Sequence, residues 1–148
     1  MSDGVSIDTS SFAKFARGLR AAEPELKLEL LREMKAAGEV VAIDARSRAN
    51  SFPRTGDGTT RIADSIRVSV SGDTIKVVAN KKKAPEARPI ENKGKSGTFR
   101  HPVGGNREVW VNQEAHPFLR PALLANRELV VAAVKRAVEK ALRKVQSI

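Results

Sequence analysis

Two long stretches with apolar residues at helical spacing limit most strongly what this 148-residue chain can fold into. The first begins near Pro24 and ends near Ala49, and the second follows Pro117 and Pro121. Their apolar residues recur every three or four positions, which places them along one face of a helix. Those of the first stretch are Leu26, Leu30, Met34, Ala37, Val41 and Ala45, and those of the second are Leu123, Leu124, Val131, Val134, Val138, Leu142 and Val145. The spacing therefore predicts two long amphipathic helices.

Shorter elements are predicted before and between these helices. Residues 11–21 carry apolar side chains at helical spacing behind a capping serine, which predicts a short N-terminal helix. Residues 66–70 and 75–78 alternate apolar and polar residues on either side of Gly72-Asp73, which predicts a β-hairpin with one buried face. Gly38 lies inside the first long helix, where glycine is unfavourable, and is expected to mark close packing.

A second pair of strands is predicted at 99–103 and 108–111, around Gly104-Gly105-Asn106. With 148 residues, the chain has the length of one ordinary domain. We predict a single α+β domain over residues 1–148, with N-terminal helices, a small antiparallel β-sheet, and a long C-terminal helix packed on the sheet.

The formal net charge is +10, and it is concentrated in two regions. Residues 81–107 carry eight basic and two acidic side chains, and residues 119–148 carry seven and two. Residues 108–118 carry two acidic side chains and no lysine or arginine. Such a field favours DNA or an acidic protein as partner. We predict that residues 80–97 form a mobile basic loop, whose candidate side chains for facing such a partner are Lys81, Lys82, Lys83, Lys93 and Lys95. The alternative is a loop whose lysines face only solvent.

The sequence lacks the residues or the spacing that several classes of functional site require. The chain has no cysteine, which excludes disulfides, a cysteine nucleophile and thiolate metal sites. His101 and His116, even with Glu114, do not have the spacing of a metal site. The glycine-containing run 56–60 lacks the Lys-Ser/Thr ending of a phosphate-binding loop. We expect no enzyme activity, no metal and no cofactor.

Membrane association is not expected either. Residues 1–10 are polar and lack the basic start and apolar run of a signal peptide. No stretch approaches the ~20 apolar residues that a membrane-spanning helix needs.

Trp110 and Phe118 are two of only six aromatic residues in the chain. Aromatic side chains are enriched at the energetic centres of protein interfaces, so both are candidate interface anchors. The alternative is that they fill the core between the sheet and the last helix. The two interpretations are compatible in a chain with so few aromatics.

The C-terminal half carries a more specific pattern. Residues 97–106 read GTFRHPVGGN, residues 110–113 read WVNQ, and residues 115–123 read AHPFLRPAL before a long charged helix. This pattern resembles the small neck, or tail-completion, proteins of long-tailed bacteriophages, which are head-to-tail connectors among the siphovirus tail components. The residues that carry the resemblance, and are candidate interface residues through it, are Phe99, Arg100, His101, Pro102, Trp110, Pro117, Phe118 and Pro121.

The resemblance implies a virion structural protein at the head–tail interface. Such a protein assembles as a ring of identical copies around the DNA channel, with six or twelve as the numbers to test first. Its other partners are the head connector or stopper protein and the tail tube or tail terminator protein. It belongs to the neck of the virion, and to the host cytoplasm during assembly. The alternative is a stand-alone basic DNA-binding protein, and a small enzyme has no motif in its favour.

Overall fold

The computed structural model describes residues 4–8, 24–52, 60–71, 74–103 and 106–146. The helices are α2 (Pro24–Asn50), α3 (Thr60–Ser65), α4 (Ala87–Glu91), the 3-10 helix η1 (Asn92–Gly94) and α5 (Leu119–Gln146). The strands are β1 (Gly4–Asp8), β2 (Ile66–Ser71), β3 (Thr74–Ala79), β4 (Thr98–Val103) and β5 (Asn106–Glu114). The predicted α+β class and both long helices are confirmed. The short helix predicted at 11–21 lies outside the described residues.

The first sheet is antiparallel, with β3 between β1 and β2. In β2 the buried side chains alternate with exposed ones, as the predicted hairpin requires: Ile66 and Val68 are buried, whereas Arg67 and Ser69 are exposed. The strand β1 was not predicted. Val5 and Ile7 do alternate with Ser6 and Asp8, so a short strand signal was present and was overlooked. Its pairing with β3 is a tertiary contact that the local pattern does not contain.

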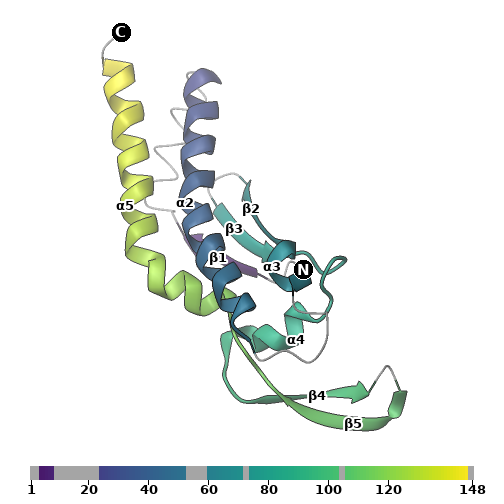
Figure 1. The fold of residues 1–148 in the computed structure, drawn as a ribbon. Helices are drawn as coiled ribbons and strands as arrows, with labels where there is room; N and C mark the ends of the chain where they lie inside the picture. Colours follow the sequence, from purple (N-terminus) through teal and green to yellow (C-terminus); the bar gives the residue numbers. More distant parts are fainter. Residues whose placement is uncertain (1–3, 9–23, 53–59, 72–73, 104–105, 147–148) are drawn as a thin grey trace.

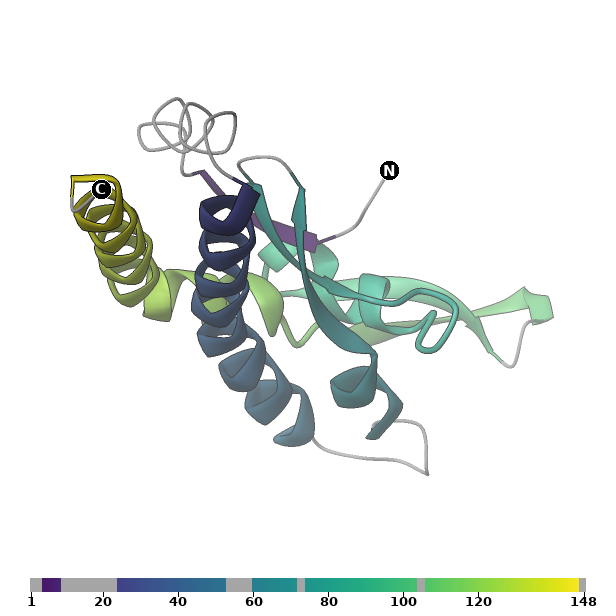
Figure 2. The same ribbon diagram turned by 90° about the horizontal axis from the view of Figure 1, so that it is seen from above.

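The helix α2 lies between the sheet and α5, so the long helices and the sheet form three layers (Figures 1 and 2). The helix α5 runs antiparallel to α2, because Asn126 near its start bonds Asp44 and Lys140 near its end lies 3.4 Å from Glu29. The predicted long C-terminal helix is confirmed, and it contacts the first sheet at β1. Its main contact is α2, since α2 has apolar residues toward both neighbours.

The core is formed by side chains from both faces of α2 and from the sheet. Val41, Ile75, Val77 and Val130 are fully or almost fully buried. At Gly38 a Cβ atom would lie 2.6 Å from Val68 Cγ1 and 2.7 Å from Ile75 Cγ2, inside van der Waals contact. The expectation that this glycine marks close packing is confirmed, since only a residue without a side chain lets α2 approach the sheet this closely.

Residues 80–97 differ from the predicted loop. They contain α4 and η1, and Ala84, Ala87 and Ile90 are buried against the core. The polar composition concealed these three positions, because each is a single apolar residue between lysines, prolines or glutamates. The mobility of this segment stays a prediction.

Candidate interaction surface

The strands β4 and β5 form a separate two-stranded antiparallel sheet, called the arm from here on. The predicted second strand pair is therefore confirmed, and both strands are longer than the predicted ranges 99–103 and 108–111. Figures 1 and 2 both show the arm projecting from the body beyond α4. An isolated pair of strands is marginally stable in water, so an arm of this kind gains stability when a partner covers it.

The arm exposes large apolar side chains. All nine residues of β5 are exposed, and Val109, Trp110 and Val111 have 49%, 46% and 40% of their surface accessible. Neighbouring residues of a strand point to opposite faces, so the two valines lie on one face and the tryptophan on the other. Both faces of β5 therefore expose large apolar side chains, which is unusual for a surface that faces only water.

Trp110 shares its face with Arg100. The guanidinium carbon of Arg100 lies 5.7 Å from the centre of the Trp110 ring, a cation–π distance. The Trp110 Nε1–H donates to the Arg107 carbonyl at 2.6 Å, which satisfies its polar atom without burying the ring. Pro102 pairs with Trp110 across the strands. The core interpretation of Trp110 is thus wrong, and its role as an interface anchor stays a prediction.

The other face of the arm holds Phe99 and His101. Their ring centres are 5.9 Å apart, and both side chains are half-buried. His101 pairs with Val111 across the strands, which continues the apolar surface toward the tip. Four of the residues singled out by the sequence, namely Phe99, Arg100, His101 and Pro102, therefore lie side by side on β4, alternating between the two faces.

Phe118 lies elsewhere, in the core, with none of its surface exposed. Its ring packs edge-on against Phe52, with the two ring centres 5.9 Å apart. Phe52 also packs against His116, with ring centres 5.2 Å apart. The core interpretation of Phe118 is confirmed. Pro117 directly precedes Phe118, and Pro121 lies in the first turn of α5, where a missing amide proton costs nothing. These prolines and Phe118 fix the passage from the arm into the last helix.

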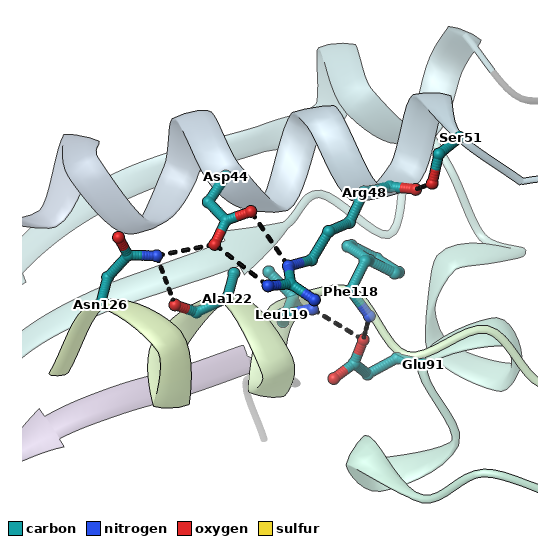
Figure 3. A network of polar contacts seen from close by, with 8 residues as sticks. All are labelled: Asp44, Arg48, Ser51, Glu91, Phe118, Leu119, Ala122 and Asn126. Atoms are coloured by element: carbon teal, nitrogen blue, oxygen red, sulfur yellow. Dashed lines mark hydrogen bonds and ion pairs between the residues drawn. The ribbon is translucent and has the colours of Figure 1, made fainter.

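Glu91 caps the start of α5. Its Oε2 accepts hydrogen bonds from the backbone N–H of Phe118 at 2.6 Å and of Leu119 at 2.9 Å (Figure 3). Its Oε1 accepts a third from the backbone N–H of Arg120 at 2.9 Å. The first amides of a helix have no partner within it, and a carboxylate also favours the positive end of the helix dipole. The carboxylate thereby ties the segment before the arm to the segment after it.

Sequence reasoning missed this cap. Glu91 lies 27 residues before Phe118, so no local pattern connects them. The available signal was negative: the residue before α5 is Phe118, which offers no side-chain acceptor in place of the usual Ser, Thr, Asp or Asn. A helix that begins without its own cap needs an acceptor from elsewhere in the fold.

Further contacts hold the arm to the body at its base. The Ala115 N–H donates to the Gly97 carbonyl at 2.7 Å, and the His116 N–H donates to the Ile90 carbonyl at 2.9 Å. Gly94 has φ +79°, and a Cβ there would lie 2.2 Å from Arg120 Cδ. The chain can pass under Arg120 at this point only with a glycine. The base of the arm is therefore closely packed, in contrast to its exposed strands.

The predicted partner-facing lysines are all exposed and occupy two places. Lys81, Lys82 and Lys83 form a turn directly after β3, where Asn80 Oδ1 accepts the Lys82 N–H at 2.9 Å. Lys93 and Lys95 follow α4, next to the base of the arm. The two groups are thus separated along the chain by α4, and both present charge to solvent.

The described residues show neither a metal site nor a membrane-spanning helix. The described ranges contain no group of three or more His, Asp or Glu side chains able to hold a metal ion. Within those ranges no helix combines the length and the apolar character needed to cross a membrane. The glycine run 56–60 lies almost wholly outside the described residues.

The family model described as "Bacteriophage HK97-gp10, putative tail-component" matches residues 13–115. This range covers more than half of the chain and includes α2, the strands β2 and β3 of the first sheet, α4 and the arm. No curated protein and no solved structure matches the chain.

Proposed function

We propose, from the premise that the chain belongs to the HK97-gp10-like family of bacteriophage tail components, that it is a structural protein of the head–tail interface. In this proposal identical copies form a ring of six or twelve around the DNA channel. The ring joins the head connector to the tail tube, as a neck, tail-completion or tail-terminator layer. The protein then belongs to the neck of the virion and assembles in the host cytoplasm.

The exposed arm is the observation that carries this proposal. A two-stranded sheet with Val109, Trp110 and Val111 uncovered buries too little apolar surface to reward its own ordering. Its strands also present unpaired backbone groups along their outer edges, which another chain can extend by strand addition. An element with these two properties fits a subunit that completes its structure on a neighbour.

The charge supports the position at the DNA channel. Exposed lysines and arginines outnumber exposed acidic side chains on the segment before the arm and on α5. A ring of such subunits lines its passage with positive charge, which favours the phosphates of DNA or acidic faces of adjacent rings. This argument concerns partners in an assembly and requires no catalytic residue.

Mixing experiments test the proposal directly. The purified chain is examined by light scattering over a wide concentration range, alone and with the head connector and tail tube proteins of the same phage. A discrete mass of six or twelve copies, or a defined complex with either partner, is the expected result. A chain that remains monomeric and joins neither partner under any salt condition contradicts the proposal.

A stand-alone DNA-binding protein is the second candidate, and the exposed Lys81–Lys83 turn favours it. This function predicts binding of free duplex DNA whose affinity falls steeply with salt, because bound counterions are released. Replacing the three lysines by alanine should then abolish binding. A matched control replaces Lys27, Arg67 and Arg127, three exposed basic residues on other elements. Negligible affinity for DNA at low salt rules this candidate out.

A further inference from the structure

The exposed large apolar residues of the described ranges fall on only three elements. They are Leu28, Val40 and Ile43 on α2, Val109, Trp110 and Val111 on β5, and Leu124, Leu129 and Val131 on α5. The arm and the outer surface of the long helices are thus two distinct apolar regions of one chain. A head-to-tail ring needs such a pair, because each subunit contributes a different surface to each of its two contacts.

Acidic side chains lie on one face of the arm. Glu108 and Glu114 are on the face of β5 that carries Trp110, whereas Arg107 is on the opposite face. Both glutamates are exposed, and neither forms an ion pair within the described ranges. The surface that best complements β5 is therefore apolar and basic.

The exposed side of α2 has this composition. Arg32 and Lys35 lie on the same side of the helix as Leu28 and Ile43, and both basic side chains are exposed without an ion pair in the part of the chain that the structure describes. Glu39, on that side as well, is 3.3 Å from Arg46. Because Arg46 neutralises Glu39, the exposed side of α2 keeps the positive charges of Arg32 and Lys35.

The remaining acidic residues of α2 that the structure describes are held toward α5. Glu29 and Glu33 lie 3.4 Å and 3.7 Å from Lys140, and Asp44 accepts hydrogen bonds from Arg48 and Asn126 (Figure 3). These contacts remove negative charge from the exposed side of α2.

The outer surface of α5 fits β5 less well. Glu128 is exposed, forms no ion pair within the described residues, and lies between Leu124 and Val131 on one stripe. An acidic side chain within that apolar stripe would repel Glu108 and Glu114 of an arm placed on it. On α2 the acidic residue in the equivalent position, Glu39, is instead paired with Arg46. The choice between the two helices therefore rests on charge, since both expose apolar side chains.

We propose that the arm of one copy docks on the exposed side of α2 of a second copy. Along β5, Trp110 and Glu114 are four residues apart, about 13 Å at the rise of a strand. Along α2, Ile43 and Lys35 are eight residues apart, about 12 Å at the rise of a helix. The tryptophan can therefore lie on Ile43 while the glutamate meets Lys35. This contact rests on the proposed ring and names its subunit interface.

Crosslinking tests the contact, and the absence of native cysteine gives a clean background. Trp110→Cys and Ile43→Cys are made in separate full-length chains, which are mixed and treated with a short bismaleimide. A covalent dimer that contains one chain of each kind is expected. The control pairs Trp110→Cys with Leu129→Cys, a residue of similar exposure on α5. Equal yields for both pairs, or no dimer for the first, overturn the proposal.

Charge exchange gives an independent readout. Glu114→Lys alone and Lys35→Glu alone should each lower the mass measured by light scattering toward the monomer, and the double variant should restore the mass of the unaltered chain. Glu128→Lys and Lys27→Glu are matched controls on other surfaces and should leave the mass unchanged. Circular dichroism verifies that every variant is folded.

The outcomes separate this contact from the ring itself. If the unaltered chain forms a discrete ring while both single variants form the same ring, the docking site is wrong and the proposed function stands. If the unaltered chain is monomeric, gives no crosslink and joins no phage partner, both fail. A ring that is lost in each single variant and regained in the double variant supports both.

Discussion

The two small antiparallel sheets of this protein both carry large apolar side chains but have opposite surroundings. In the first sheet, Val68, Ile75 and Val77 are buried in the core with residues of α2. In the arm, three consecutive apolar residues of β5, Val109, Trp110 and Val111, remain exposed. A strand pattern therefore states which residues share a face, and a neighbouring layer determines whether that face becomes core.

The comparison separates stability from association. Side chains of the first sheet contribute free energy to folding of the single chain, because folding removes them from water. Side chains of the arm contribute little to that free energy, because they stay in water until a partner covers them. Substitutions in the two sheets should accordingly affect different measurements.

The largest difference is expected between the two aromatic residues Phe118 and Trp110. Phe118→Ala removes a fully buried ring and should lower the free energy of unfolding by about 3–5 kcal/mol. Trp110→Ala should lower it by less than about 1 kcal/mol, since the ring is half exposed. Urea denaturation of both variants measures these changes, and similar losses would contradict the assignment of one ring to the core and one to the surface.

A matched valine pair sharpens the comparison of the sheets. Val77→Ala on β3 should lower the free energy of unfolding by about 2 kcal/mol, because it leaves a small cavity under α2. Val111→Ala on β5 should change it by about 0.5 kcal/mol or less. The same denaturation measurement is used. If Val111→Ala proves as costly as Val77→Ala, the arm is packed in the free monomer.

Glu91 joins the exposed arm to the packed body, and its removal should have an intermediate effect. Glu91→Gln keeps the size of the side chain but loses its charge and one acceptor, so the free energy of unfolding should fall by about 1–2 kcal/mol. Hydrogen exchange at the amides of Phe118, Leu119 and Arg120 should accelerate. Glu108→Gln, an exposed control, should change neither quantity.

At Gly38 the expected net effect on stability is small, because two terms oppose each other. Gly38→Ala raises helix propensity by about 1 kcal/mol, but its methyl group would meet Val68 and Ile75 inside contact distance, at a cost of about 1–3 kcal/mol. We expect a net loss of about 1 kcal/mol in thermal or urea unfolding. A stabilised variant would show that α2 can move away from the sheet without cost.

Much of the candidate surface was predictable from local patterns. The two runs at 99–103 and 108–111 on either side of Gly104-Gly105-Asn106 located the arm. The motif residues Phe99, Arg100, His101, Pro102 and Trp110 all lie on it. Pro117 and Pro121 located the start of α5 to within a few residues. The cap by Glu91 was not predictable, since its three partners are 27 or more residues away.

The sequence by itself determined the two long helices, the strand pairs and the close approach at Gly38, because these depend on spacing within a few residues. Only the tertiary structure decided that α5 packs on α2, that Phe118 is buried while Trp110 is exposed, and that Glu91 caps α5. These features depend on which surfaces meet across long separations in the chain. The spacing of residues along the chain does not reveal these long-range contacts, since burial and capping depend on the neighbouring element and not on the residue alone.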